Sequence, residues 1–228
     1  MSATQASETE GAPLFKEFLA VHAVMTRGAE LVVRSFTELA GGAAVDTRTL
    51  VTTVQWFVDF VRHHRLSEDE LLWPVLRERC PEAVRSLDLL AEADDALADG
   101  LDELESVIAR IAEERRAGGS VSWGHAMKEG TLASRRIRDG LAERFAVMEP
   151  LLRGMLRKAL DEDVPKLREA VADGVRRGEP HLVLGLLEHP EPVPGRERVH
   201  AAFPLPVRWA RGMLLSRFRK TLKDLAAD

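Results

Sequence analysis

The chain has 228 residues, of which 45% are hydrophobic and 30% are charged, a composition typical of a globular protein and not of a disordered one. This length suits one sizeable domain, or a domain with an appendage. The formal net charge of −5 gives no reason to expect nucleic acid as a partner, and the absence of tyrosine excludes a tyrosyl radical or a phenol acid from any mechanism.

The N-terminal stretch MSATQASETEG is polar, so we expect residues 1–12 to form a disordered tail and not a signal peptide. No apolar run is long enough to span a bilayer. The single cysteine, Cys80, excludes an internal disulfide and fits a reducing compartment. These features predict a cytoplasmic protein of bacterial type, either an enzyme or a binding protein.

The first predicted helix covers residues 13–39 and ends at the break AGGAAVD. Its apolar positions recur every three or four residues, and one histidine, His22, falls in this stripe between Phe18 and Met25. A polar side chain that faces a core needs a hydrogen-bond partner or a metal ion.

The second predicted helix covers residues 47–79, with Asp46 or the next threonine as its N-cap. Two polar side chains, His64 and Glu68, fall in its apolar stripe, one helical turn apart. Pro74 should kink or loosen the last turns of this helix, because proline lacks the backbone N–H that an α-helix requires.

The third predicted helix begins at Pro81 and ends at the segment AGGS, and its stripe contains Asp94. The fourth covers residues 122–160, and its stripe contains Arg144. Short connections between long amphipathic helices indicate antiparallel neighbours. The sequence therefore predicts an all-α, up-down-up-down four-helix bundle over residues 13–160.

A C-terminal helical extension is expected over residues 161–228. Its last segment, LPVRWARGMLLSRFRKTLKDL, forms an amphipathic helix with a strongly basic polar side. Such a helix either lies on a membrane surface or packs its apolar side on the bundle. We favour the second interpretation, with four side chains packed: Trp209, Met213, Leu214 and Phe218.

The polar groups of the four helices should meet at one depth. Counting residues from each connecting turn, at about 1.5 Å of rise per residue, places them within about one helical turn of one another. Isolated buried charges cost several kcal/mol, so these groups must pair or bind a metal. We therefore predict a single buried polar layer, made of His22, His64, Glu68, Asp94 and Arg144.

The stretch HHRLSEDELLWPVL carries a family resemblance. A first helix with one histidine, followed by an H-x-x-x-E motif that ends in LLWP, resembles the hemerythrin-like (HHE cation-binding) domain over residues 13–160. This resemblance implies a four-helix bundle that holds two non-heme irons, bridged by carboxylates and an oxygen atom. The residues that match its ligand pattern are His22, His64 and Glu68.

The chain also departs from the family's pattern. The family has a histidine on the third helix, where this chain has Asp94, and a second H-x-x-x-E/D motif on the fourth, where it has Gly140 and Arg144. Three expected ligands are therefore replaced, and reversible oxygen binding by a di-iron pair does not follow from the resemblance.

The three matching residues suit a single ion. His64 and Glu68 lie on one helix face, and His22 adds a second imidazole. Two histidines and one carboxylate with open positions are the ligands of mononuclear iron(II) oxygenases. We predict one non-heme iron ion, with manganese and zinc as alternatives. Asp94 would be a fourth ligand or would hydrogen-bond a ligating histidine.

Asp94 and Arg144 are also the candidate catalytic residues, with Asp94 as proton acceptor and Arg144 as anchor for an anionic substrate. Gly140 should leave a cavity beside the ligands, because glycine replaces a whole imidazole there. The predicted function is a metal-dependent oxidoreductase or tailoring enzyme acting on a small molecule. A substrate-sized cavity beside Gly140 would favour this interpretation.

Other interpretations remain open. The chain could bind or sense oxygen, nitric oxide or a metal without turnover, since gas ligands need little room. A metal-free layer, with Arg144 bridging Glu68 and Asp94, would be purely structural. A two-metal site completed by other residues is a further alternative. Outside the layer, His63 should be an exposed neighbour, and His125 with Glu129 an exposed pair.

Overall fold

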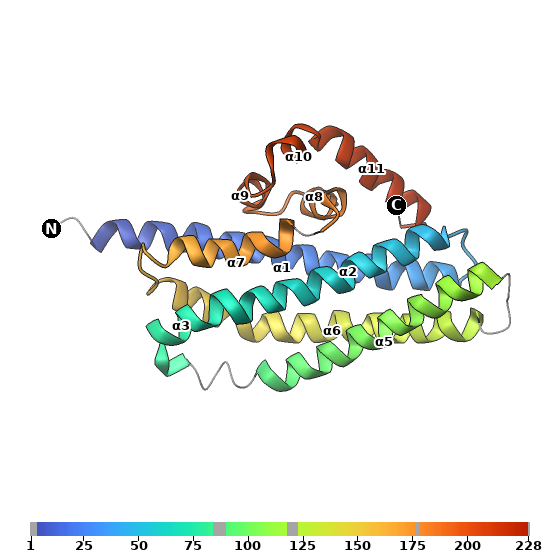
Figure 1. Cartoon of the computed structure of the whole chain (residues 1–228), viewed down its shortest axis with the longest axis horizontal. Coiled ribbons are helices and arrows are strands. Elements are labelled where there is room, and N and C mark those ends of the chain that lie inside the picture. The colour runs from blue at the N-terminus through green and yellow to red at the C-terminus, as the bar shows by residue number, and fades with distance from the viewer. Residues whose placement is uncertain (1–3, 84–89, 118–122, 177, 228) are drawn as a thin grey trace.

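The computed structural model describes residues 4–83, 90–117, 123–176 and 178–227, and this part of the chain is helical with no strand. The all-α prediction is therefore confirmed. The four long helices lie lengthwise beside one another (Figure 1): α1 (Thr4–Ala40), α2 (Thr47–Ser67), α5 (Leu90–Ala117) and α6 (Trp123–Leu156). Each of them packs on two others, because α1 and α5 both contact α6 and α2. Within the described ranges, no helix has the length and apolarity to cross a membrane.

The turn between α1 and α2 follows the sequence signals. Gly42 has a φ of +87°, a conformation that glycine adopts without strain. Asp46 is the N-cap of α2, and its Oδ1 accepts a hydrogen bond of 2.7 Å from the backbone N–H of Thr49. This hydrogen bond stabilises the carboxylate and lowers the pKa of Asp46.

The C-terminal part of the second predicted helix is interrupted by a π-helical turn. After α2, residues Glu68–Leu72 form the π-turn η1, and α3 (Trp73–Arg79) follows. Pro74 explains the interruption, since its ring would clash with the carbonyl four residues earlier in a regular α-helix. The predicted loosening at Pro74 thus takes the form of a π-turn that begins at Glu68.

Three predicted helix ends differ from the structure. α1 begins at Thr4, within the expected tail, and Gly11 packs so closely on α6 that a Cβ there would lie 2.5 Å from the Leu156 carbonyl oxygen. The predicted start of the third helix at Pro81 forms instead the short 3-10 turn η2 (Pro81–Ala83), and α5 is described from Leu90; residues 84–89, over which the third helix was also predicted, lie outside the described residues. α6 ends at Leu156, four residues earlier than predicted.

The C-terminal extension folds back along the long helices (Figure 1). It contains α7 (Val164–Arg176), α8 (Pro180–Glu188), α9 (Arg196–Ala201), α10 (Leu205–Trp209) and α11 (Arg211–Asp224). α7 packs on α2, η1 and α1, whereas α8 packs on α1 and α11. The backbone N–H of Asp46 donates to the carbonyl of Asp224 over 2.7 Å, so the end of α11 is fixed to the turn before α2.

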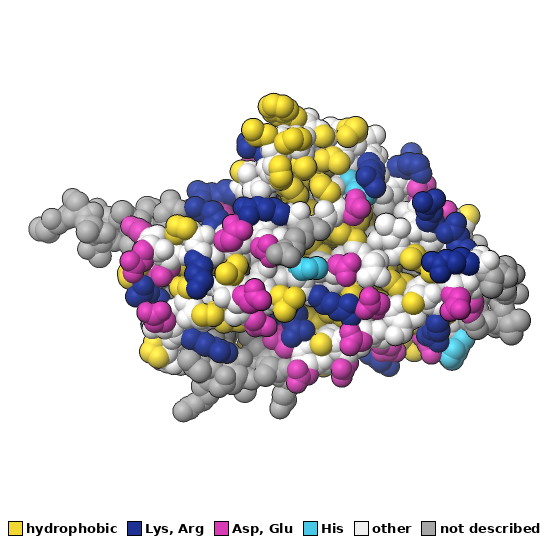
Figure 2. All heavy atoms as spheres, viewed as in Figure 1, with side chains coloured by type: hydrophobic (Ala, Val, Ile, Leu, Met, Phe, Trp, Pro, Cys, Tyr) yellow, Lys and Arg dark blue, Asp and Glu magenta, His cyan; other side chains and the backbone are white. Residues whose placement is uncertain are grey.

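The expected packing of Trp209 and Met213 is wrong. Their exposed fractions are 81% and 69%, while Leu214 and Phe218 are buried as predicted. The reason is geometric: α11 buries a stripe spaced four residues apart, and Met213 is turned about 100° from Leu214. Trp209 belongs to the separate short helix α10. Figure 2 shows apolar side chains gathered on the protruding part of this face.

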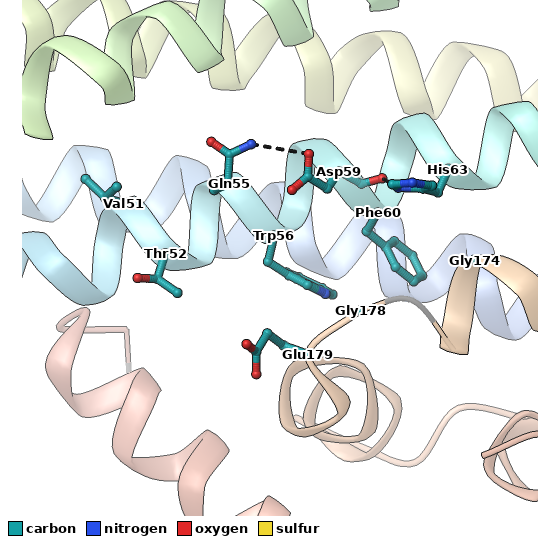
Figure 3. Close-up of a pocket in the computed structure, with 10 residues that line it drawn as sticks. All are labelled: Val51, Thr52, Gln55, Trp56, Asp59, Phe60, His63, Gly174, Gly178 and Glu179. Carbon is teal, nitrogen blue, oxygen red and sulfur yellow. Dashed lines mark hydrogen bonds between the residues drawn. The ribbon is translucent and has the colours of Figure 1, made fainter. Parts of the chain in front are cut away.

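A pocket of about 480 Å³ lies between α2 and the N-terminus of α8 (Figure 3). Trp56, Phe60 and Glu179 line it, together with His63. His63 Nδ1 lies 2.7 Å from the carbonyl oxygen of Asp59 on its own helix. His63 therefore faces away from the polar layer, and it is partly exposed, as predicted.

Candidate metal centre

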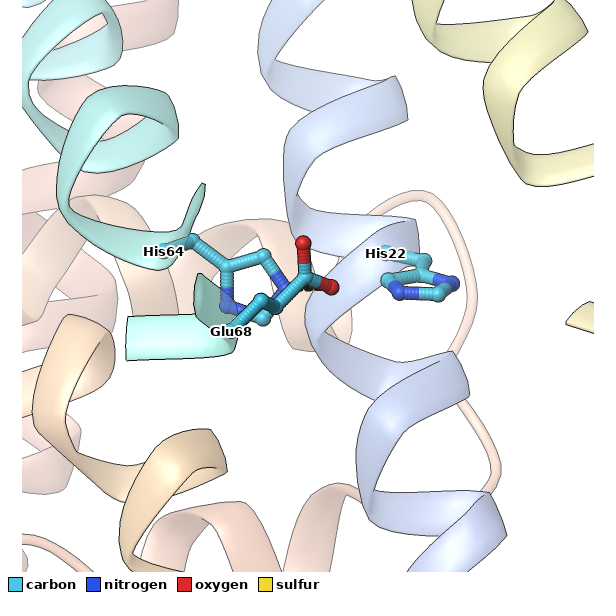
Figure 4. Close-up of side chains that lie close together, drawn as sticks. All are labelled: His22, His64 and Glu68. Carbon is cyan, nitrogen blue, oxygen red and sulfur yellow. Dashed lines mark ion pairs between the residues drawn. The ribbon is translucent and has the colours of Figure 1, made fainter. Parts of the chain in front are cut away.

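Three predicted ligands converge in the interior of the protein. His22 on α1, His64 on α2 and Glu68 on η1 each offer one ligand atom, and these atoms lie within 4.8 Å of one another. Their exposed fractions are 2%, 1% and 0%. Figure 4 shows the Glu68 carboxylate between the two imidazole rings.

Local structure explains why His64 and Glu68 meet. They stand four residues apart, at the end of α2 and the start of η1, so both side chains leave the same helix face. His22 approaches from α1. Its ring centroid lies 5.9 Å from that of His64, and the two ring planes are 82° apart. The two imidazoles therefore do not stack, and their edges are directed into the layer.

Several atoms of this group have no hydrogen-bond partner. They are His22 Nε2, both ring nitrogens of His64, and Glu68 Oε1. His64 Nε2 lies only 3.2 Å from Glu68 Oε1, but the two atoms lack hydrogen-bond geometry. Buried polar atoms are nearly always satisfied, so this cluster of unsatisfied nitrogen and oxygen atoms calls for a ligand.

A metal ion fits this donor set. Two metal–ligand bonds of about 2.1 Å span at most about 4.2 Å, so the widest pair at 4.8 Å would close by about 0.6 Å. Neutral imidazole and carboxylate are the ligand types that iron, manganese and zinc accept.

Glu149 orients His22, a contact that the sequence analysis missed. Its Oε1 lies 3.1 Å from His22 Nδ1, and it accepts the Nδ1–H when the imidazole carries its proton there. Such a carboxylate leaves Nε2 with a free lone pair, as in most histidine–metal sites. Burial lowers the pKa of His22, although Glu149 acts in the opposite direction, so the ring is neutral at pH 7. Phe145 stacks on the same ring at 4.1 Å.

Arg144 holds the two carboxylates of the layer. Its Nη2 donates to Glu68 Oε2 over 2.8 Å, and its Nε donates to Asp94 Oδ1 over 2.6 Å. The third nitrogen, Nη1, lies 3.0 Å from the sulfur of Met148. Arg144 thus makes the bridge between Glu68 and Asp94 that the metal-free alternative requires.

This arrangement fixes the charges. Burial acts to raise the pKa of Glu68, but the Arg144 guanidinium outweighs it and holds the pKa well below its usual value. Burial likewise acts to lower the pKa of Arg144, and the two carboxylates more than reverse this effect. Glu68 is therefore an ionised carboxylate, and its second oxygen, Oε1, has no hydrogen-bond partner.

Asp94 lies in the polar layer as a partner of Arg144. It bonds Arg144 and lies 3.6 Å from Arg65 Nε, and it is not in the group of three ligand atoms. Its side chain is 21% exposed. The predicted role of hydrogen-bond partner to a ligating histidine belongs to Glu149 instead. In this arrangement Asp94 pairs with Arg144, and its role as a fourth ligand stays a prediction.

Open space surrounds Gly140, but none of the five pockets found among the described residues joins it to the three candidate ligands. No atom lies within 4 Å of the position that a Cβ would occupy there, and the residue is partly exposed. Five surface pockets in the described part of the chain have volumes between about 300 and 590 Å³, and none is lined by Gly140 or by the three ligands. The expected substrate cavity is not among them.

The C-terminal extension closes the site from outside. Gly174 of α7 packs on His64, since a Cβ at residue 174 would lie 3.5 Å from the His64 Cα. Ser67 Oγ donates to Asp173 Oδ2 over 3.0 Å and so ties α7 to the last residue of α2. The sequence predicted this extension only as a segment that follows the four long helices. The residue pattern of α7 does not show which residues of the other helices it covers.

Other candidate residues behave as predicted. His125, which is exposed, and Glu129, which is partly exposed, form a pair at 3.1 Å, and Glu129 also pairs with Arg110. Cys80 is buried, and burial raises the pKa of its thiol, so it is a poor nucleophile.

No protein-family model matches the sequence, and comparison with curated proteins and with solved structures gives no match.

Proposed function

We propose that the polar layer holds one divalent non-heme metal ion, with iron(II) as the first candidate. The ligands are His22, His64 and Glu68, a two-histidine, one-carboxylate set that leaves coordination positions open. The single observation that carries the proposal is the cluster of buried, unsatisfied nitrogen and oxygen atoms in these residues. On this proposal the chain is a one-metal variant of the hemerythrin-like four-helix bundle.

Each neighbouring side chain has a task in this site. Glu149 keeps the proton of His22 on Nδ1, which leaves Nε2 for the ion. Arg144 holds Glu68 ionised and fixes its orientation through Oε2. Phe145 and α7 exclude water from the two imidazoles. A bound iron(II) ion would supply one-electron chemistry and a position for an exogenous ligand.

The exogenous ligand is small on this proposal. None of the five pockets adjoins the ligands. Two nitrogens of the Arg144 guanidinium, Nη2 and Nε, already donate to the carboxylates of Glu68 and Asp94. An anionic substrate would have to displace Asp94 from Arg144. A diatomic ligand such as oxygen or nitric oxide needs no such change. We therefore propose a gas-binding or gas-sensing function ahead of turnover of a larger substrate.

A metal-free structural network is the second candidate. It is favoured by the ion pairs that Arg144 already makes with Glu68 and Asp94, at 2.8 and 2.6 Å. These pairs leave Glu68 Oε1 and the histidines unsatisfied, which is the reason to prefer the metal centre.

Adjacent histidines provide a matched test. The protein is loaded anaerobically with iron(II), manganese(II) or zinc(II), and bound metal is measured after removal of free ion. We expect about one ion per chain in the wild type and in His63→Gln, and almost none in His64→Gln, because only His64 is a ligand. Nitric oxide should then give an iron–nitrosyl electron paramagnetic resonance signal in the two loaded proteins. If the wild type binds no ion, the metal centre is refuted and the layer is a structural network. If it binds an ion but gives no nitrosyl signal, gas binding is refuted and the metal centre stands.

A further inference from the structure

We propose that α10 and the start of α11 form a docking surface for an anionic membrane, independent of the metal centre. The surface is built on three protruding side chains, here named the apolar tip: Leu205, Trp209 and Met213. Their exposed fractions are 54%, 81% and 69%. Other large exposed apolar side chains in the described residues stand singly on α2, on α6 and just after α6.

The exposure of the apolar tip comes from a fixed backbone. α11 buries Leu214, Phe218 and Leu222 against the rest of the protein. Phe218 packs so closely on α8 that a Cβ at Gly185 would lie 2.0 Å from the ring. Because this stripe holds α11 in place, Met213 stays on the exposed side of the helix, next to α10. Figure 2 shows hydrophobic side chains gathered on the protruding part of the molecule.

Charge is segregated toward the same elements. Residues 205–224 contain six Lys and Arg and one acidic residue, so their net charge is +5. The whole chain has a net charge of −5, so the remaining residues together carry −10. Arg208, Arg219 and Lys223 are exposed and make no ion pair among the described residues. A local excess of unpaired cations beside an acidic body orients the molecule toward an anionic surface.

An anionic lipid surface fits this chemistry better than a second copy of the chain. Two copies that met through their apolar tips would bring the arginines of both together, and like charges repel. Lipid headgroups instead neutralise the cations while the indole of Trp209 lies at the boundary of headgroup and acyl chain, where tryptophan is enriched. Apolar side chains with flanking Lys and Arg are the signature of helices that lie on a membrane surface.

Vesicle binding by the full chain tests this proposal. Co-sedimentation is measured with vesicles of phosphatidylcholine alone and with about 30 mol% phosphatidylserine, in low and high salt. We expect binding to the anionic vesicles only, weakened by salt. Replacing Trp209 and Met213 together by serine should lower the vesicle partition coefficient by about tenfold or more. Leu66→Ser, at a 54% exposed leucine on α2, is the matched control and should change nothing.

Three outcomes would overturn the proposal. They are an absence of binding to phosphatidylserine vesicles, an equal loss in Leu66→Ser, or unchanged binding in the Trp209 and Met213 variant. Thermal melts of each variant show whether the fold is retained. Size-exclusion chromatography with light scattering adds a separate readout. A wild-type dimer that the double variant dissociates, without vesicle binding, would assign the apolar tip to self-association and refute the membrane.

Discussion

Replacing Arg144 by methionine should weaken the fold and strengthen metal binding at the same time. Methionine keeps most of the volume of the side chain but removes the guanidinium that bonds Glu68 and Asp94 at 2.8 and 2.6 Å. Glu68 is then a fully buried carboxylate without its cation. In the wild type the same guanidinium places a permanent positive charge beside the ligand set. This charge repels a divalent cation and lowers its affinity. We therefore expect opposite effects on the apoprotein and on metal affinity.

The magnitude follows from the burial of the pair. Removing one partner of a buried ion pair costs about 3–5 kcal/mol. For a chain of this length, about 2–4 °C of melting temperature corresponds to 1 kcal/mol, so the apoprotein should melt about 6–20 °C lower. Metal at about 100 times its dissociation constant contributes about 2.7 kcal/mol and should restore much of this loss.

The assay combines two measurements on each protein. Melting temperature is recorded with and without metal, and affinity is measured by anaerobic isothermal titration with iron(II) or zinc(II). Affinity should rise by about tenfold or more in Arg144→Met, because no fixed cation then opposes the ion. The control is Arg136→Met on the same helix, whose 65% exposed side chain pairs with Glu103; an exposed pair of this kind contributes at most about 1 kcal/mol. A lower affinity in Arg144→Met would refute this reasoning, because the orientation of Glu68 by Arg144 would then favour the ion more than the repulsion between the two cations opposes it.

Four further predictions concern separate parts of the molecule. Gly140→His with Arg144→Glu should raise bound metal from about one ion toward two per chain, measured by metal analysis, because it restores a histidine and a carboxylate on α6 where open space surrounds residue 140. Glu149→Gln should lower metal affinity by about 10–100-fold in isothermal titration while leaving the ligands in place, and an unchanged affinity would remove Glu149 from the site. Burial and Arg217 lower the pKa of His181 from 6.5 to about 4, so the unfolded chain takes up a proton first and stability falls as pH drops from 6.5 to 4. His181→Gln should flatten this part of the pH dependence of the unfolding free energy in urea titrations. Gly185→Ala should cost about 1–3 kcal/mol or more by steric clash with Phe218, whereas Gly154→Ala, with no atom near its Cβ, should stabilise α6 by about 0.5–1 kcal/mol in the same titrations.

The sequence by itself determined the residues of the polar layer and much of the helix arrangement. Apolar stripes and a constant rise per residue are local properties, so they predicted the depth of five polar groups on four helices before any packing was known. The N-cap at Asp46 and the disturbance at Pro74 were equally local, since each follows from the hydrogen-bonding capacity of a few neighbouring residues.

Only the tertiary structure decided which partners these groups have. Glu149 and Phe145 lie beside the predicted stripe of α6, and the rotation of α6 against α1 brings them to His22. The contact of Gly174 with His64 and the exposure of Trp209 depend on how the C-terminal extension docks. Docking of this kind is set by contacts between residues far apart in the chain, and such contacts leave no periodic signal in either segment. The sequence pattern of one helix shows which face is apolar. Which other element packs on this face depends on the tertiary structure.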